Sequence, residues 1–229
     1  MAMAIVEGDN SDDDLWATEA SFMYGFGGND TINGSNFNDI IEAGTGNDVI
    51  YANAGNDMVI GNEGSDRLYG GDGDDFIVGD NTLDATGAGN DFLFGGAGND
   101  RLHGNYGNDN YLYSVNSGID IINDGLTAAG IAGYGGGTDT LEFSNATFND
   151  IYFQHLASSN DLLLFTSAGV DENGSIQHGV IIQDFYLNDN NTNIEYMKDS
   201  TGARFDLSQL LTPDETSYTE SSSHSLAFA

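Results

Sequence analysis

The chain has 229 residues, of which 37 are Asp or Glu and four are Lys or Arg, so its formal net charge is −33. A chain this acidic is a poor partner for nucleic acid or an anionic membrane surface, because both carry negative charge. It contains no Cys that could form a disulfide and no apolar run long enough for a transmembrane segment.

Residues 1–7 are expected to form the N-terminal edge of the fold, and from Gly8 the sequence repeats with a period of nine. The units fit the pattern G-G-x-G-N-D-x-U-x, where U is a large apolar residue. They read GDNSDDDLW from Gly8, and from Gly25 GFGGNDTIN, GSNFNDIIE, AGTGNDVIY, ANAGNDMVI, GNEGSDRLY and GGDGDDFIV, then from Thr86 TGAGNDFLF, GGAGNDRLH and GNYGNDNYL. Residues 17–24 are interpreted as a degenerate unit. Residues 79–85 are interpreted as a lengthened turn whose Asp80 and Asp84 offer, as an alternative, an extra ion site.

Two columns of this alignment dictate structure. Position 8 is always apolar, and position 6 is always Asp: Asp13, Asp30, Asp39, Asp48, Asp57, Asp66, Asp75, Asp91, Asp100 and Asp109. Small residues at positions 1, 2 and 4 allow positive φ and tight turns. Positions 7 to 9 favour a short strand with one inward side chain. Turn, strand, turn, strand predicts a flattened coil with two nonapeptides per turn, which is a solenoid.

Aspartates stacked on every coil, at a strand spacing of about 4.8 Å, would repel one another without a cation. Carboxylates and turn carbonyls offer hard oxygen ligands, which suit Ca²⁺. Mg²⁺ demands a strict octahedron, and Zn²⁺ prefers Cys or His, of which these units contain only His103. The pattern therefore predicts several bound calcium ions. Departures at Phe37, Ala43 and Ala52 put single sites in doubt.

Beyond residue 112 the period loosens but does not stop. Residues 115–123 (VNSGIDIIN) and 134–142 (YGGGTDTLE) keep the pattern, with Asp120 and Asp139 at position 6. These two aspartates are added to the predicted metal ligands. The predicted roll therefore extends over residues 8–142, with a loop at 124–133.

From residue 143 the composition changes to strand-like runs at 151–156, 161–166, 179–186 and 194–199. The end of a solenoid leaves unpaired strand edges and a bare core, so residues 143–211 are expected to form a β-rich cap. Residues 212–229 are rich in Ser and Thr and are expected to be a flexible tail.

The nonapeptide resembles that of the RTX (repeats-in-toxin, haemolysin-type) calcium-binding family. The resemblance implies an all-β fold, a parallel β-roll in which position-6 Asp and backbone carbonyls hold Ca²⁺ between coils. The stretches Asp139–Phe143, Asp150–Phe153, Asn160–Leu164, Val180–Tyr186 and Ile194–Gly202 also resemble the family's C-terminal cap. The family further implies a bacterial protein exported by a type I secretion apparatus, with the signal in the tail. We expect an extracellular or cell-surface monomer, part of an adhesin, toxin or exoenzyme.

No catalytic motif accompanies the repeats. The four His residues (His103, His155, His178 and His224) have no metal-binding spacing, and no GxSxG motif occurs, so no enzymatic activity is expected. His103 falls at position 9, which points out of the roll. Two alternatives remain open. Outward aromatics such as Tyr51 and Tyr69 would suit a carbohydrate-binding module, and the Asn residues of position 5 would suit an ice-binding face.

Overall fold

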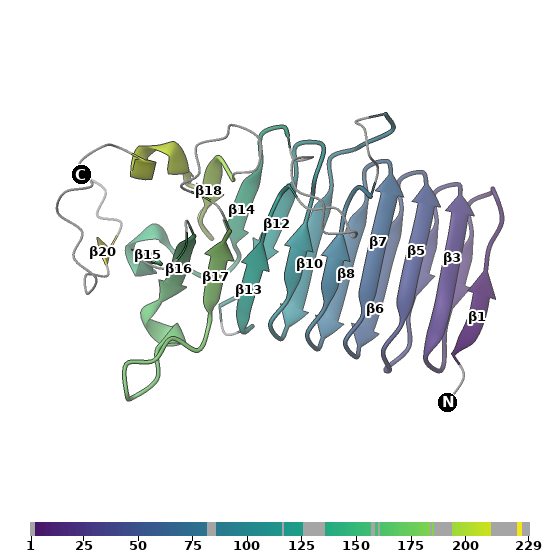
Figure 1. The fold of residues 1–229 in the computed structure, drawn as a ribbon, viewed down its shortest axis with the longest axis horizontal. Helices are drawn as coiled ribbons and strands as arrows, with labels where there is room; N and C mark the ends of the chain where they lie inside the picture. The colour runs from purple at the N-terminus through teal and green to yellow at the C-terminus, as the bar shows by residue number, and fades with distance from the viewer. Residues whose placement is uncertain are drawn as a thin grey trace.

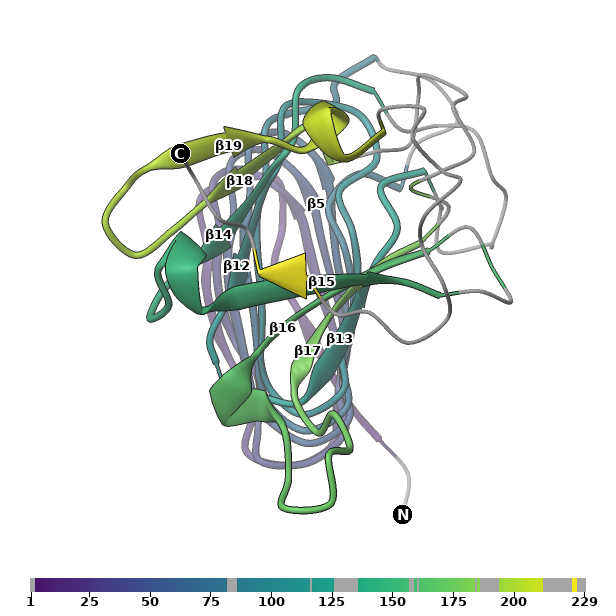
Figure 2. The same ribbon diagram turned by 90° about the vertical axis from the view of Figure 1, so that its left-hand side faces the viewer.

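The computed structural model describes residues 3–81, 86–115, 117–125, 136–156, 159, 161–183, 185, 194–211 and 224–225. In these ranges strands dominate, and they form two sheets that run along the molecule from β1 at the N-terminal end (Figure 1). Viewed end-on, successive coils superimpose as a flattened oval (Figure 2). The fold is therefore the predicted parallel β-roll.

Odd-numbered strands of the repeat region form sheet 1 and even-numbered strands form sheet 2. In spatial order, sheet 1 consists of β1 (Ala4–Glu7), β3 (Ser21–Gly27), β5 (Ile40–Thr45), β7 (Met58–Glu63), β9 (Phe76–Val78), β11 (Arg101–His103), β13 (Ile119–Ile122), β17 (Gly179–Ile182), β16 (Leu162–Thr166), β15 (Ile151–His155) and β20 (His224–Ser225). Sheet 2 consists of β19 (Arg204–Asp206), β18 (Tyr196–Lys198), β14 (Thr140–Phe143), β12 (Asn110–Tyr113), β10 (Phe92–Ala97), β8 (Arg67–Asp72), β6 (Val49–Ala54), β4 (Thr31–Asn33) and β2 (Asp14–Trp16). Three short 3₁₀ turns complete the elements, η1 (Phe148–Asp150), η2 (Ser167–Gly169) and η3 (Leu207–Leu211).

The register of the ladders confirms two nonapeptides per coil. Ile32 pairs with Ile50 in sheet 2, and Ile41 pairs with Val59 in sheet 1, a step of 18 residues in both. Leu68 pairs with Leu93 instead, a step of 25, so the seven extra residues of the lengthened turn leave the register intact. The pairs are parallel, and each coil stacks only on its neighbours.

The core is a double row of position-8 side chains between the sheets. Ile32, Ile50 and Leu68 are completely buried from sheet 2, as are Ile41 and Val59 from sheet 1. Each such side chain contributes about 1.5–3 kcal/mol by leaving water. The short unit at 17–24 joins this row, because Met23 pairs with Ile41 and is fully buried.

Glycine at position 4 is required by the distance between coils. Gly46 has φ of +134°, a region that other residues rarely adopt, and a Cβ atom there would overlap the carbonyl oxygen of Gly28 in the preceding coil. Gly64 repeats this relationship with Gly46. The small residues of the turns therefore set how closely the coils stack.

The C-terminal strands continue both sheets of the roll. β17 pairs in parallel with β13, and β18 pairs in parallel with β14, across 60 and 56 residues of sequence. Beyond them β16 and β15 run antiparallel (Figure 2). The four strand-like runs expected after residue 143 are thus confirmed as β15, β16, β17 and β18. The boundaries predicted at residues 7, 142 and 211 stay predictions, and most of the expected tail lies outside the described residues.

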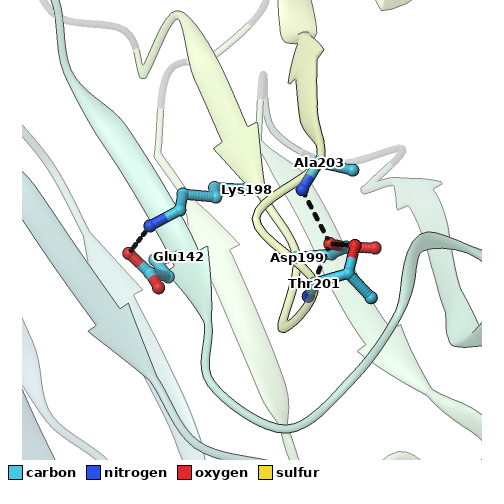
Figure 3. Close-up of polar contacts among 5 residues, drawn as sticks. All are labelled: Glu142, Lys198, Asp199, Thr201 and Ala203. Carbon is cyan, nitrogen blue, oxygen red and sulfur yellow. Dashed lines mark hydrogen bonds and ion pairs between the residues drawn. The ribbon is translucent and has the colours of Figure 1, made fainter.

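A compact turn ties β18 to the roll (Figure 3). Lys198 Nζ donates to Glu142 Oε2 of β14 at 2.8 Å. Asp199 Oδ1 accepts from the backbone N–H and hydroxyl of Thr201 and from the N–H of Ala203. Its Oδ2 accepts from the N–H of Phe148, whose ring lies in the core. One aspartate therefore fixes both the turn and the start of η1.

Candidate metal centres

All twelve predicted position-6 aspartates fall into two columns that run along the roll. The long column precedes strands of sheet 2 and contains Asp13, Asp30, Asp48, Asp66, Asp91, Asp109 and Asp139. The short column precedes or starts strands of sheet 1 and contains Asp39, Asp57, Asp75, Asp100 and Asp120. All except Asp13 are buried. The structure therefore places every predicted ligand in a repeating position.

One hydrogen bond repeats along both columns. The backbone N–H of each position-6 aspartate except Asp120 and Asp139, the last of each column, donates to Oδ1 of the aspartate one coil nearer the C-terminus. The N···O distance is 2.8 Å from Asp48 to Asp66 and 2.7 Å from Asp39 to Asp57. It is longest, 3.2 Å, from Asp100 to Asp120. Oδ1 of each of these carboxylates thus joins two neighbouring coils.

The second oxygen of most of these carboxylates has no such partner. Among the described residues, buried Oδ2 atoms without a hydrogen bond occur at Asp30, Asp48, Asp57, Asp66, Asp75, Asp91, Asp100 and Asp109. These atoms face the position-1 residue of their own unit, since a Cβ at Gly61 would overlap Oδ2 of Asp66. A buried carboxylate oxygen left unsatisfied is costly. A row of them is the arrangement that a hard cation would stabilise.

The same burial perturbs protonation. Loss of hydration, followed by repulsion from neighbouring carboxylates, raises the pKa of Asp48 to about 6 and the pKa of Asp66 to about 8. In the short column the pKa of Asp57 is raised to about 6 and that of Asp75 to about 8, again chiefly by burial. At neutral pH, Asp66 and Asp75 are therefore mostly protonated in the fold unless a cation takes the place of the proton.

Asp39 differs from the other buried members. Ser35 donates to Asp39 Oδ2 from its backbone N–H at 2.6 Å and from its hydroxyl at 2.9 Å. This turn also carries Phe37 at position 4, and Phe37 is exposed. The sequence put the metal site of the Phe37 unit in doubt, and in the structure Asp39 of this unit has no partnerless Oδ2 to offer an ion. The units that begin with Ala43 and Ala52 keep a free carboxylate oxygen, because Oδ2 of Asp48 and Oδ2 of Asp57 have no hydrogen-bond partner among the described residues.

Sequence reasoning missed three residues in or beside the columns, namely Ser21, Glu195 and Asp124. Ser21 extends the short column, because its N–H donates to Asp39 Oδ1 at 2.6 Å. Glu195 ends the long column by accepting the N–H of Asp139 at 2.7 Å. Its alignment with position 6 in NNTNIEYMK was the available signal. Asp124 lies beside Asp109 and Asp139. Asp80, weighed only as an extra site, is fully buried with a partnerless Oδ1, whereas Asp84 lies outside the described residues.

The Asn and Tyr side chains considered for ice or carbohydrate binding contact neighbouring residues of the roll. At position 5, Asn29 Oδ1 accepts the N–H of Asn47, whose Oδ1 accepts the N–H of Ser65. The Asn row therefore joins neighbouring coils by its amide oxygens. Tyr51 and Tyr69 are stacked with ring centroids 4.9 Å apart. These contacts give both rows a structural role in the roll.

One expectation about histidine is wrong. His103 was expected to point outward, but it is only 3% exposed, and its Nδ1 lies 2.7 Å from the carbonyl oxygen of Asn123. Its ring also packs against Phe76. The next coil therefore covers position 9 here.

Comparison with known proteins bears directly on the repeats. The family model described as RTX calcium-binding nonapeptide repeat (4 copies) matches residues 24–59, 52–84 and 86–113. Among solved structures, the extracellular lipase LipA from Serratia marcescens is similar at 17% identity with a TM-score of 0.23, over 73% of this chain and 38% of the lipase. A search of curated proteins found no match. In the described part of the chain, no helix has the length and apolarity to span a membrane.

Proposed function

Residues 24–113 are a block of RTX calcium-binding nonapeptide repeats, and from this premise we propose that calcium binding at position 6 drives folding of the whole roll. The proposal extends the ligand set beyond the matched residues, to Asp13, Asp120 and Asp139. The observation that carries it is the row of buried Oδ2 atoms without a hydrogen-bond partner in the described structure. Aspartates and carbonyl oxygens of flexible turns fit the irregular oxygen shell of Ca²⁺.

The charge of the chain makes folding conditional on the ion. With a net charge of −33 and two columns of buried carboxylates, the metal-free roll brings like charges together in a poorly hydrated space. Ca²⁺ bound to the folded chain and not to the unfolded chain shifts the equilibrium towards folding. Binding free energy is then folding free energy.

We further propose that this switch serves export by a type I secretion apparatus. Inside a bacterial cell, where Ca²⁺ is scarce, the chain would stay unfolded and transportable. Outside, Ca²⁺ near the millimolar range matches the affinity of extracellular calcium modules. The module is proposed to be non-enzymatic and monomeric, and to act as part of a secreted adhesin, toxin or exoenzyme.

Far-UV circular dichroism against calcium concentration tests the proposed switch, with Mg²⁺ as the matched control. We expect a cooperative transition from coil to β structure at about 0.1–1 mM Ca²⁺ and none with Mg²⁺ at the same concentrations. A chain that is fully β in calcium-depleted buffer at neutral pH contradicts the proposal. Such a result would favour a constitutive binding module.

A further inference from the structure

A cluster of three buried carboxyl groups lies at the point in the sequence where residues 124–133 interrupt the nonapeptide repeat. Asp109 and Asp139 hold position 6 in neighbouring coils of the long column. Asp124 belongs to neither column. Each of the three offers an oxygen within 4.8 Å of the other two, and all three side chains are buried. This geometry differs from the coils between Asp13 and Asp66, in which position-6 aspartates follow one another with no additional buried acid.

Asp124 stands where the preceding coil has glycine. Leu102 pairs with Ile122, and the N–H of Asn123 donates to the carbonyl of Leu102, so the two segments stay in register to this point. Gly104 and Asp124, two residues beyond the paired leucine and isoleucine, therefore hold equivalent places. A Cβ at Gly104 would overlap Oδ2 of Asp109, so this place faces a position-6 carboxylate. At Asp124 the chain adds a third carboxyl group there.

Tyr111 orients the added carboxyl group. Its hydroxyl donates to Oδ1 of Asp124 at 2.5 Å and accepts the N–H of Gly104 at 2.6 Å. Tyr111 is fully buried at position 8, where the other repeat units carry aliphatic residues. The phenol at this place reaches the carboxyl cluster and fixes one oxygen of Asp124.

The remaining oxygens point to a ligand. Oδ2 of Asp124 and Oδ2 of Asp109 are buried and accept no hydrogen bond from any described residue. Asp124 is itself only 1% exposed. The carboxyl groups of Asp124 and Asp139 form a close pair, because they offer oxygens within 4.8 Å of each other. A cation there would neutralise the pair and satisfy the two partnerless oxygens together.

We propose that Asp109, Asp124 and Asp139 form a three-carboxylate Ca²⁺ site that is separate in composition from the regular repeat sites. The inference rests on the proposed function for Asp109 and Asp139 and adds Asp124 as a ligand from outside the repeat. Because the number of charged ligands tunes calcium affinity, this site binds more tightly than the sites of the regular coils. It would therefore fill first, at the coil nearest the C-terminal strands.

Equilibrium dialysis with Ca²⁺ on the full 229-residue chain tests the site. The wild type should show one ion bound on the order of tenfold more tightly than the others. Asp124→Asn keeps the size of the side chain and an acceptor for Tyr111, and it should lose this tight phase. Asp14→Asn is the matched control, because it removes the same charge from an exposed residue of β2 and should leave the tight phase unchanged.

A second variant tests whether a lost tight phase reflects a lost ligand or a misfolded chain. Asp124→Gly restores the residue type of Gly104, and it should fold at saturating Ca²⁺ by circular dichroism and lack the tight phase. If the wild type binds calcium and both variants keep the same tight phase and number of ions, Asp124 is not a ligand and the three-carboxylate site is overturned. If the wild type binds no calcium at all, the proposed function itself is overturned.

Discussion

The side chain of Glu195 accepts the backbone N–H of Asp139 at 2.7 Å, so a glutamate from the C-terminal region takes the place of the next aspartate in the long column. The contact crosses 56 residues of sequence and coincides with the parallel pairing of β14 and β18. The column of carboxylates therefore ends at β18, the last parallel strand of sheet 2, beyond which β19 pairs antiparallel. The C-terminal region thus completes the carboxylate column and adds Ile194 and Met197 to the core.

The two columns predict that substitutions of two position-6 aspartates, Asp66 and Asp39, have different effects on calcium binding. Asp66→Asn keeps the acceptor for the Asp48 N–H but removes the charge, so we expect the calcium midpoint of folding to rise several-fold. Asp39→Asn should shift the midpoint less, because Ser35 already satisfies Oδ2 of Asp39. Calcium titrations followed by circular dichroism compare the two variants. Equal shifts would argue against the partnerless oxygen as the metal ligand.

Protonation should partly replace calcium. The pKa of Asp66 and the pKa of Asp75 are raised from 3.8 to about 8 by burial, so the folded chain binds protons more tightly than the unfolded chain. The stability from these protons is fully present below about pH 4 and is lost as the pH rises towards 8. In calcium-depleted buffer, β content should therefore be higher at pH 5 than at pH 8. The opposite order, measured by circular dichroism, would contradict the burial of these carboxyls in the metal-free fold.

Calcium affinity should show the reverse dependence on pH. Protons compete for the same oxygens, so the midpoint of calcium binding by the folded chain is expected to rise on acidification from pH 8 to pH 6, across the raised pKa values of the columns. Calcium titrations at several pH values measure it. A midpoint independent of pH in this range would mean that the raised carboxyls are not ligands.

Substitutions at Gly174 and Gly46 distinguish the cost of backbone strain from the cost of pushing neighbouring coils apart. Gly174 has φ of +82° and open space around its Cβ position, so Gly174→Ala should lower the free energy of unfolding by about 1 kcal/mol. Gly46→Ala adds a clash with the carbonyl of Gly28 to a φ of +134°, and should cost more than about 3 kcal/mol. Urea unfolding at saturating Ca²⁺ gives both values. Similar losses would show that the coils can move apart at little cost.

The turn after β18 should matter more than its ion pair (Figure 3). Asp199→Ala removes an acceptor used by Thr201, Ala203 and Phe148, and should cost about 2–4 kcal/mol. Glu142→Gln removes a partly exposed ion pair with Lys198, which should cost at most about 1 kcal/mol. Urea unfolding measures both. A larger loss for Glu142→Gln would reverse the assignment of what anchors β18.

The fold of the repeats was predictable because each unit encodes its own turn and strand. The nine-residue period alone assigns Asp48 to the column of carboxylates and Ile50 to the core, without any knowledge of distant contacts. The partner of β17 was not predictable in this way, because Val180 pairs with Asp120 across 60 residues and shares no repeat with it. Asp124 was missed for a related reason, since the position-1 glycine is lost just where the insertion hides the register.

The repeated bond between coils gives the roll two chemically different ends. In each column the amide comes from the coil nearer the N-terminus and the carboxylate from the coil nearer the C-terminus, from Asp13 and Asp30 to Asp139 and Glu195. A coil stacked on the N-terminal side of another therefore meets carboxylate acceptors, whereas a coil stacked on the C-terminal side meets backbone N–H donors. The roll is thus polar along its axis, like a filament with unlike ends.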